Sequence, residues 1–396
     1  TDEPAGDPEA AVERFFVSDP LPRAGRTCTL AAHIANRGGG ELRGLRVRLA
    51  LPEGVRCAEG DTETKEVPPV DYYEPARVSW RIASDTAGDV RLALRDAATG
   101  NELAAVTERF LPPLALSKAA YVPEPKPVRG ALEVGAYYFP GWNTHDRWQP
   151  ILSYPERTPV LGHYREGDPE VADWHIKLAV EHGITFFCYD WYWNKGDTQL
   201  AHGLHDGYFN ARYRSLLKFC LLWANHAPTV HSPEDNAAVC RYWIDNYFRR
   251  PEYFKIETRP LLVIFDPGSM KRDLGIEGSR AAIALWHAMT RERGAGEVLV
   301  AGCGTPGAAL EDLEAMGFDA VTGYNWPSCG AGGRNRVPYE DVARAQYEHW
   351  WLPMARRDAM PVIVPASPGW DSRPWHGAKA LVQTERSPAA FAEHLT

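Results

Sequence analysis

The sequence predicts a chain in two parts, an all-β sandwich followed by an α/β barrel of the (β/α)8 type. Residues 11–111 hold short β segments separated by turn residues, with no helical periodicity of useful length. From residue 131 onward, apolar strand segments alternate with amphipathic helical segments. That alternation is typical of a parallel sheet covered by helices on both faces.

The first part is expected to be a β-sandwich over residues 1–111. Apolar and charged residues alternate along 45–49, which indicates a half-buried strand, and Asn36–Gly40 is a strong turn signal. The candidate strands are Val12–Val17, Thr27–Asn36, Leu45–Leu51, Arg77–Ile82, Val90–Arg95 and Leu103–Phe110. Residues 112–130 contain five prolines and are interpreted as a stiff linker or a surface strap.

The second part, residues 131–396, is predicted to be the barrel. Its candidate strands are Glu133–Phe139, Ile184–Tyr189, Lys218–Trp223, Leu261–Phe265, Val298–Gly302, Ala320–Tyr324 and Pro361–Pro365. Its candidate helices are Pro169–His182, Asn236–Phe248, Ser279–Arg293 and Tyr339–Arg357. A closed barrel has eight strands. A helix begins at Ser387 and a last strand is not seen, so the barrel is expected to lack its last strand in this chain.

Composition excludes several classes of function. The net charge of −9 and the lack of a basic stripe disfavour nucleic acid as a partner. No apolar run approaches the ~18 residues of a membrane span. The seven cysteines form no C-x-x-C pair and the histidines show no ligand spacing, so we expect no metal site. A disulfide between Cys28 and Cys57 in the first part stays open as an alternative to two free thiols. A nucleotide-binding doubly wound sheet is the weaker alternative, because no G-x-G-x-x-G follows a strand.

Aromatic and amide or carboxylate side chains follow several predicted barrel strands. Since the carboxyl ends of barrel strands share one face, these side chains are expected to meet and to bind a saccharide, with aromatic faces stacking on sugar C–H groups. The candidate substrate-binding residues are Tyr138, Trp142, His163, Asp190, Trp191, Tyr192, Trp223, Asn225, Tyr324, Asn325, Trp326, Trp370, Asp371 and Arg373.

Each candidate also has a purely structural interpretation. Asp190 can pair with a neighbouring amide or arginine, and Asp266, before Pro267-Gly268, can be a turn former. Asp371 can be an Asx-turn residue. Glycoside cleavage usually needs two carboxyl groups beside the scissile bond. The strand ends supply single aspartates, so Asp190, Asp266 and Asp371 are the candidate catalytic residues and no close glutamate pair is found.

The second part resembles the glycoside hydrolase family 99-like group, which includes bacterial endo-α-mannosidases and WbsX-type glycosyltransferases. The stretches that carry the resemblance are 137–142 (YYFPGW), 159–164 (PVLGHY), 168–171 (DPEV), 190–193 (DWYW), 222–225 (LWAN), 259–265 (RPLLVIF) and 367–374 (SPGWDSRP). The stretches at 34–39 and 47–54 in the first part resemble adhesion-type immunoglobulin-like modules of secreted bacterial enzymes.

The resemblance implies a barrel that acts on α-linked sugars without a metal or organic cofactor, in a secreted or periplasmic protein. It also implies that the two catalytic glutamates of the group follow the helix that begins at Ser387, beyond this chain. We therefore expect this chain to be most of a glycoside hydrolase that acts on an α-linked glycan, and a mannose-containing glycan is one candidate. The alternatives are a non-catalytic carbohydrate-binding protein and a glycosyltransferase of surface-polysaccharide synthesis.

Overall fold

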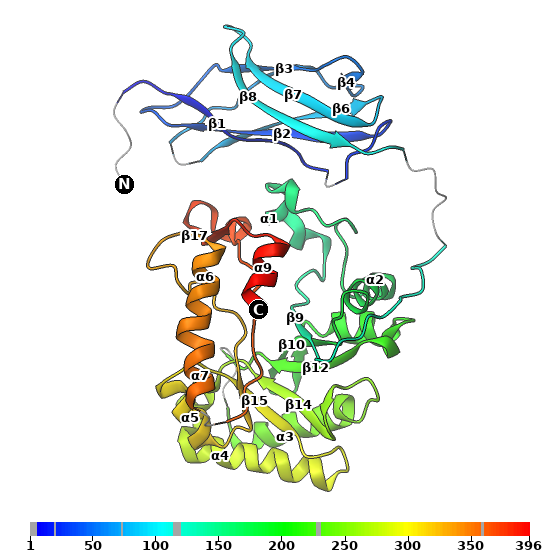
Figure 1. Cartoon of the computed structure of the whole chain (residues 1–396), viewed down its shortest axis with the longest axis vertical. Helices are drawn as coiled ribbons and strands as arrows, with labels where there is room; N and C mark the ends of the chain where they lie inside the picture. Colours follow the sequence, from blue (N-terminus) through cyan, green and yellow to red (C-terminus); the bar gives the residue numbers. More distant parts are fainter. Residues whose placement is uncertain (1–5, 20, 73, 114–119, 227–230, 358–359) are drawn as a thin grey trace. The chain divides into compact units, whose positions relative to one another are not determined.

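The computed structural model describes residues 6–19, 21–72, 74–113, 120–226, 231–357 and 360–396 (Figure 1). Two compact units are found. One comprises residues within 1–120 together with 148–163, and the other comprises 121–147 together with 164–396. The predicted linker at 112–130 lies partly outside the described residues. Within the described ranges, no helix has the length and apolar character needed to cross a bilayer.

The first unit contains two four-stranded antiparallel sheets, in the orders β1-β2-β6-β4 and β5-β3-β7-β8. The strands are β1 (Ala10–Val17), β2 (Thr27–Asn36), β3 (Arg46–Ala50), β4 (Val55–Cys57), β5 (Thr64–Glu66), β6 (Ala76–Ser84), β7 (Gly88–Asp96) and β8 (Glu102–Phe110). Apolar side chains from both sheets, among them Leu30, Leu49, Trp80 and Leu92, share one core. The unit is therefore a sandwich. Cys28 and Cys57 are both free thiols.

A short segment that lies between barrel elements in the sequence packs with the first unit. It holds α1 (Gln149–Leu152) and the 3-10 turn η2 (Pro155–Arg157). Arg77 donates a hydrogen bond to the carbonyl of Leu152 at 3.0 Å, and Arg14 is paired with Glu156.

The second unit is built on a parallel sheet in the order β9-β10-β12-β14-β15-β16. Its strands are β9 (Gly135–Tyr138), β10 (Phe186–Asn194), β12 (Lys218–Trp223), β14 (Arg259–Ile264), β15 (Leu299–Cys303) and β16 (Ala320–Thr322). Two short strands, β11 (Asp197–Gln199) and β13 (Lys255–Ile256), pair antiparallel with β10 and β14. A separate pair is formed by β17 (Arg336–Pro338) and β18 (Val382–Thr384).

The strand predicted over Pro361–Pro365 is wrong as a continuous strand. Only Val362 forms a parallel bridge, to Val321 of β16. Pro361 and Pro365 lack an amide hydrogen, so neither can donate to a ladder at this edge. This edge of the described sheet is therefore held by a single bridge.

Helices cover the sheet as the alternation predicts (Figure 1). They are η1 (His145–Trp148), α2 (Pro169–Val180), η3 (Gly203–Gly207), η4 (Tyr208–Asn210), η5 (Arg214–Leu216), α3 (Pro233–Trp243), η6 (Ile244–Phe248), α4 (Pro267–Glu292), α5 (Ala308–Met316), α6 (Tyr339–Gln346), η7 (Tyr347–Trp351), α7 (Leu352–Arg357), α8 (Arg373–His376), η8 (Gly377–Lys379) and α9 (Pro388–Leu395). Elements η3, η6 and η7 are π-helical.

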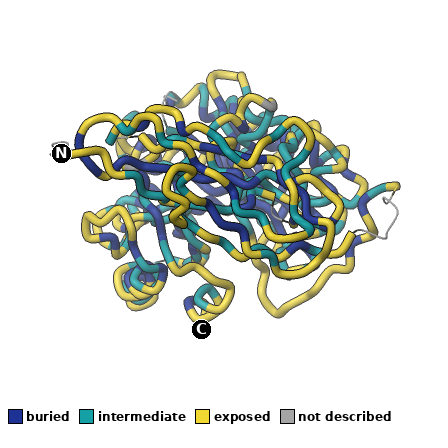
Figure 2. Tube along the Cα trace, turned by 90° about the horizontal axis from the view of Figure 1, so that it is seen from above, coloured by how far each residue is buried: buried dark blue, intermediate teal, exposed yellow. Residues whose placement is uncertain are grey.

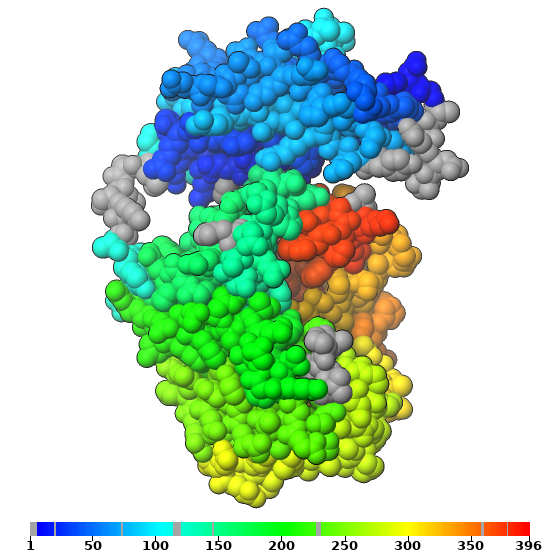
Figure 3. Space-filling model, turned by 180° about the vertical axis from the view of Figure 1, so that it is seen from behind, coloured from blue at the N-terminus to red at the C-terminus, as the bar shows by residue number. Residues whose placement is uncertain are grey.

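The predicted end helix is confirmed, because Ser387 caps α9 by accepting a hydrogen bond from the Ala390 amide at 3.1 Å. In the space-filling view, the red surface of α9 lies against orange residues that include α6 (Figure 3). The hydrogen bond between Tyr339 in α6 and His394 in α9, at 2.9 Å, joins these two helices.

The parallel sheet is curled. Five strand spacings separate β9 from β16, which in a flat sheet would be about 24 Å. Yet the Tyr137 hydroxyl on β9 donates to the carbonyl of Gly323, just past β16, at 3.0 Å. Buried residues lie mainly in the interior of the trace, and exposed ones lie mainly on its outside (Figure 2). The described sheet is thus a half-barrel whose inner surface brings distant strands together.

Candidate functional site

Strand β10 presents its side chains to two different environments, because successive residues of a strand point to opposite faces. Asp190 bonds to Tyr324, which follows β16, so it faces the inside of the curl. Trp191 bonds to Tyr247 of η6, so it faces the covering helices. This alternation decides which predicted site residues can meet.

Asp190 is the central residue of the inner face. Its side chain is buried, and the Tyr324 hydroxyl donates to Oδ2 at 3.0 Å. The other oxygen, Oδ1, has no hydrogen-bond partner among the described residues. Burial raises the pKa of Asp190 to about 7, against the lowering effect of the Tyr324 hydrogen bond. The carboxyl group is therefore poised to exchange a proton near neutral pH.

A wall of rings surrounds this carboxyl group. Tyr324 lies 4.8 Å from Tyr137 and 5.3 Å from Phe265, measured between ring centroids. Phe265 lies 5.2 Å from His226, which in turn lies 6.0 Å from Tyr192. These residues come from β9, β10 and the segments just past β12, β14 and β16. The expected meeting of strand ends is thus found for Asp190, Tyr192 and Tyr324.

Trp191 and Trp223 lie on the other side of the sheet, which corrects their expected place at the saccharide-binding face. Trp191 is 1% exposed and donates its indole hydrogen to Tyr247 at 3.0 Å. Trp223, which is fully buried, packs 5.2 Å from Trp243 and 6.0 Å from Trp286. Both indoles form the core between sheet and helices, where no sugar ring can reach them.

Asn225 and Asp266 hold two strand ends together. The Asn225 amide donates to the carbonyl of Asp266 at 2.8 Å and accepts from its backbone amide at 2.7 Å. Asp266 in turn caps α4, accepting from the Ser269 amide at 3.1 Å and from its hydroxyl at 2.5 Å. Asp266 therefore has a structural role as a helix cap, since both of its carboxylate oxygens accept hydrogen bonds from Ser269.

The residues after β16 and around 370 are spread over other contacts. Trp326 stacks on Trp350 of η7, with centroids 3.9 Å apart, while Asn325 beside it is half-buried. Asp371 accepts hydrogen bonds from the Arg373 guanidinium on both oxygens, the shortest at 2.6 Å. Its charge is therefore balanced, unlike that of Asp190. The half-buried Trp370 accepts a backbone hydrogen bond from Gln383.

A second polar cluster lies after β9 and includes residues that sequence reasoning missed. Glu166 is 2% exposed, and its Oε1 accepts from the backbone amide of Trp142 at 3.1 Å. Its Oε2 lies 3.4 Å from Nε2 of His202. The Trp142 ring lies 6.2 Å from that of Trp375, which is 58% exposed. Glu166 stands alone in a polar stretch, so no spacing pointed to it.

Tyr138 and His163 fall outside both clusters. The Tyr138 hydroxyl forms a hydrogen bond with Nδ1 of His175 at 2.9 Å, and burial lowers the pKa of His175 to about 4. His163 groups with the first unit, where its ring stacks on Trp148 at 5.2 Å. Throughout the described ranges, no three His, Cys, Asp or Glu side chains are grouped so as to hold a metal ion.

Comparison with known proteins gives matches of three kinds, which are curated relatives, solved structures and a family model. Two curated relatives are an "Uncharacterized protein WxcX" from each of two strains of Xanthomonas campestris pv. campestris, B100 and ATCC 33913. Each is 26% identical over 285 residues, a match that takes in 65% of this chain and only 39% of the relative.

The solved structures that match include a GH99 endo-alpha-mannosidase from Bacteroides thetaiotaomicron. In complex with BIS-TRIS-propane it is 15% identical, with a TM-score of 0.45 over 66% of this chain and 78% of that one. Another structure of this mannosidase has a TM-score of 0.44 over 67% and 82%.

The family model described as "Glycosyltransferase WbsX" matches residues 139–396, which include Asp190, Tyr324 and the Trp142 cluster. That match takes in well over half of the chain, and this protein therefore belongs to the WbsX family.

Proposed function

We propose that this chain binds an α-linked glycan at the inner face of its parallel sheet and takes part in cleaving it. The observation that carries the proposal is Asp190, a buried carboxyl group whose pKa is raised to about 7 and whose Oδ1 accepts no hydrogen bond from any described residue. A general acid needs a pKa near the working pH, and glycosidases obtain it by burying a carboxyl group.

The ring wall around Asp190 supports a saccharide ligand. Tyr192, Tyr324 and His226 combine aromatic faces with polar atoms, the mixture that packs on sugar C–H groups while bonding hydroxyls. Trp142 and the exposed Trp375 form a second aromatic surface in the same unit. We propose that this second pair contacts a further sugar unit of the same glycan.

Cleavage needs a second carboxyl group, and neither of the other two aspartate candidates, both in the described part of the chain, is available to act with Asp190. Asp266 caps a helix and Asp371 is paired with Arg373. Following the group that the second part resembles, we propose that the catalytic glutamates follow the position of Thr396, on the last barrel strand. A secreted or periplasmic location and an immunoglobulin-like first unit belong to the same proposal.

Two other functions each have an observation in their favour. The family description favours transfer of a sugar to a growing polysaccharide. The lack of a second available carboxyl group beside Asp190 among the described residues favours a carbohydrate-binding role without catalysis. All three share a saccharide at the inner face, and they differ in whether a bond is broken or formed.

The test is titration with α-linked mannose oligosaccharides and other α-glycans, followed by tryptophan fluorescence and by the unfolding temperature. We expect Asp190→Asn to weaken binding about tenfold, the usual loss for a hydrogen bond to a charged group. Glu292→Gln, an exposed change on α4, serves as the control and should bind normally. If no glycan perturbs the wild-type chain, the proposal is wrong.

Activity separates the three functions. Product analysis compares this chain with a form extended by about 40 residues, enough for one more strand and its loops. Hydrolysis in the extended form alone supports the glycosidase. Transfer from a nucleotide-sugar donor supports the transferase, and binding without turnover in both forms supports the non-catalytic role.

A further inference from the structure

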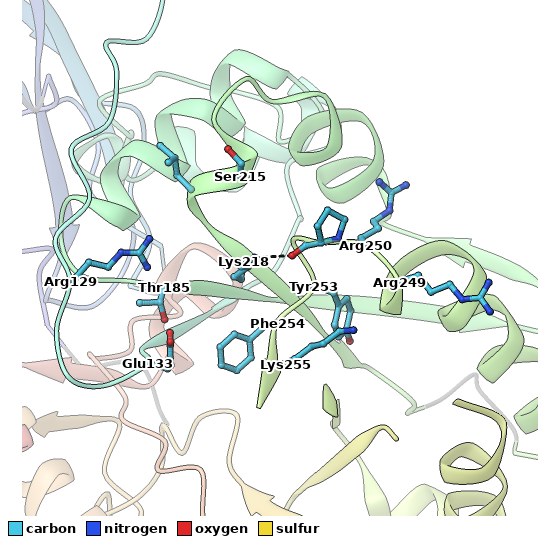
Figure 4. A pocket seen from close by; sticks show the side chains of 12 residues that line it. Arg129, Glu133, Thr185, Ser215, Lys218, Arg249, Arg250, Tyr253, Phe254 and Lys255 are labelled. Atoms are coloured by element: carbon cyan, nitrogen blue, oxygen red, sulfur yellow. Dashed lines mark hydrogen bonds between the residues drawn. The ribbon is translucent and has the colours of Figure 1, made fainter. Parts of the chain in front are cut away.

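A hollow of about 420 Å³ opens at the amino-terminal ends of the parallel strands (Figure 4). Thr185, which precedes β10, and Lys218, the first residue of β12, line it together with Tyr253 and Lys255 at the approach to β14. Asp190 lies further along β10, toward its carboxyl end. The hollow is therefore a different place from the proposed saccharide site, at the opposite end of the same strands.

The lining of this hollow is strongly basic in a chain that is acidic as a whole. Its charged residues are Arg129, Lys218, Arg249, Arg250, Lys255 and the single carboxylate Glu133. The chain has a net charge of −9. Among the described residues, none of these five cations forms an ion pair with a carboxylate. With five cations and one carboxylate, the lining of the hollow therefore carries a net positive charge.

Backbone carbonyls hold four of these cations without neutralising them. Lys218 donates to the carbonyl of Pro251 at 2.8 Å, a bond drawn in Figure 4, and Lys255 donates to that of Ala295 at 3.3 Å. Arg249 donates to Arg293 at 2.6 Å and Arg250 to Asn246 at 2.7 Å.

A carbonyl fixes a side chain in place but carries no full charge, so the repulsion among neighbouring cations persists. A lysine has three donors and an arginine has five, so each of the four keeps donors that these bonds leave open. No hydrogen bond to the Arg129 guanidinium is found among the described residues, and Arg129 lies with Thr185 and Glu133 at one side of the hollow (Figure 4).

We propose that this hollow binds an oxyanion of the phosphate type, either free or carried as an ester on a sugar or nucleotide. Such an anion offers several acceptor oxygens and between one and two or more negative charges near neutral pH, which match fixed cations with open donors. The volume lies within the usual range for small-molecule sites. The contrasting interpretation is that the cations serve only to cap the carbonyls they touch, as basic residues often do near helix ends.

Calorimetric titration with pyrophosphate at constant ionic strength tests the proposal. Arg129→Met removes a charge without removing a known contact, and it should weaken pyrophosphate binding about tenfold, the loss expected for one charge-assisted hydrogen bond. Arg356→Met is the matched control, since Arg356 is exposed on α7 and away from the hollow lining. It should leave binding unchanged.

Further titrations with inorganic phosphate, mannose 1-phosphate and uridine diphosphate identify the source of the anion. Tighter binding of pyrophosphate or phosphate assigns the site to the free ion, and tighter binding of either ester assigns it to an esterified ligand. The proposal is overturned if none binds at about 10 mM, a range that still detects weak millimolar sites. Equal weakening by both methionine variants would likewise reject a specific site. Binding of neutral glycans is measured in a separate titration. If no glycan binds, the proposed saccharide site is wrong, but the result for the anion site still stands.

Discussion

Asp190 differs from the other acidic candidates in what surrounds it. Asp266 and Asp371 have both oxygens occupied, by Ser269 and Arg373. Asp190 has one oxygen bonded to Tyr324 and one without a partner in the described residues. An incompletely satisfied buried carboxyl group costs stability, and such a cost is tolerated where the group serves a function.

The raised pKa of Asp190 makes stability depend on pH in a definite direction. The unfolded chain releases this proton near pH 3.8, whereas the folded chain keeps it until about pH 7. Between these values the folded state binds more protons, so this residue's contribution to stability falls as pH rises through 7. Relative to wild type, Asp190→Asn should therefore gain about 1–3 kcal/mol in its free energy of unfolding between pH 5 and pH 8.5. Thermal unfolding at both pH values measures this, and equal differences at the two would contradict it.

Tryptophans near the site divide into core and surface groups. Trp191→Phe removes a buried hydrogen bond to Tyr247 and part of a packed ring, so it should cost about 1–3 kcal/mol of stability with glycan affinity unchanged. Denaturant unfolding and fluorescence titration of the same variant check the two statements. A large loss of glycan affinity with unchanged stability would show instead that Trp191 contacts the glycan.

The exposed Trp375 should behave in the opposite way. Since it is 58% exposed, Trp375→Ala should change stability by less than about 1 kcal/mol. If the pair with Trp142 contacts a sugar, the same variant should bind glycans about tenfold more weakly, as for an aromatic anchor. Unaltered titration curves would remove this pair from the site.

At the scale of single elements, much of the arrangement could be predicted from the sequence. Strands β2 and β12 have the predicted bounds, and α9 begins after the predicted serine cap. The short strands β4 and β5 were missed, because three residues carry too little periodicity to be recognised. For Trp191, composition alone could not decide the face, and only the register of β10 against its neighbours settles it.

The π-helical element η3 is shaped by its close approach to Glu166. A Cβ on Gly207 would lie 2.1 Å from the backbone oxygen of Glu166, and one on Gly203 would lie 2.8 Å from Pro140. Glu166 in turn fixes the backbone of Trp142. The two glycines thus allow the packing that positions the Trp142 loop.

Gly207→Ala should therefore destabilise the protein by about 1–3 kcal/mol, as overpacking does where backbone must move. Gly167→Ala is the matched control, because its nearest neighbour would be a side-chain carbon at 3.6 Å, an ordinary contact. That change should fall within about 0.5 kcal/mol of wild type. Chemical denaturation measures the free energy of unfolding of both variants. Similar losses of stability in the two would refute the role of this close approach.

At the scale of the whole chain, the site arises from the curl of the sheet. Alternating strands and helices predicted a parallel sheet. The carboxyl ends of its strands predicted that Asp190, Tyr192 and Tyr324 meet, but they also predicted this wrongly for Trp191 and Trp223. The approach of Tyr324 to Asp190 depends on curvature that no local pattern encodes, since 134 residues separate them. Glu166 was missed for the same reason, as its partners His202 and Trp142 are distant in sequence.

Each unit has its own hydrophobic core, so the two should respond separately to perturbation. Trp80 is fully buried in the core of the first unit, and Trp80→Ala should cost that unit about 3–5 kcal/mol. Calorimetry should then show that one unfolding transition moves to a lower temperature. A glycan bound at Asp190 should move the other transition to a higher temperature. If Trp80→Ala lowers every transition equally, or abolishes the shift caused by glycan, the two cores unfold as a single cooperative body and the binding site depends on both.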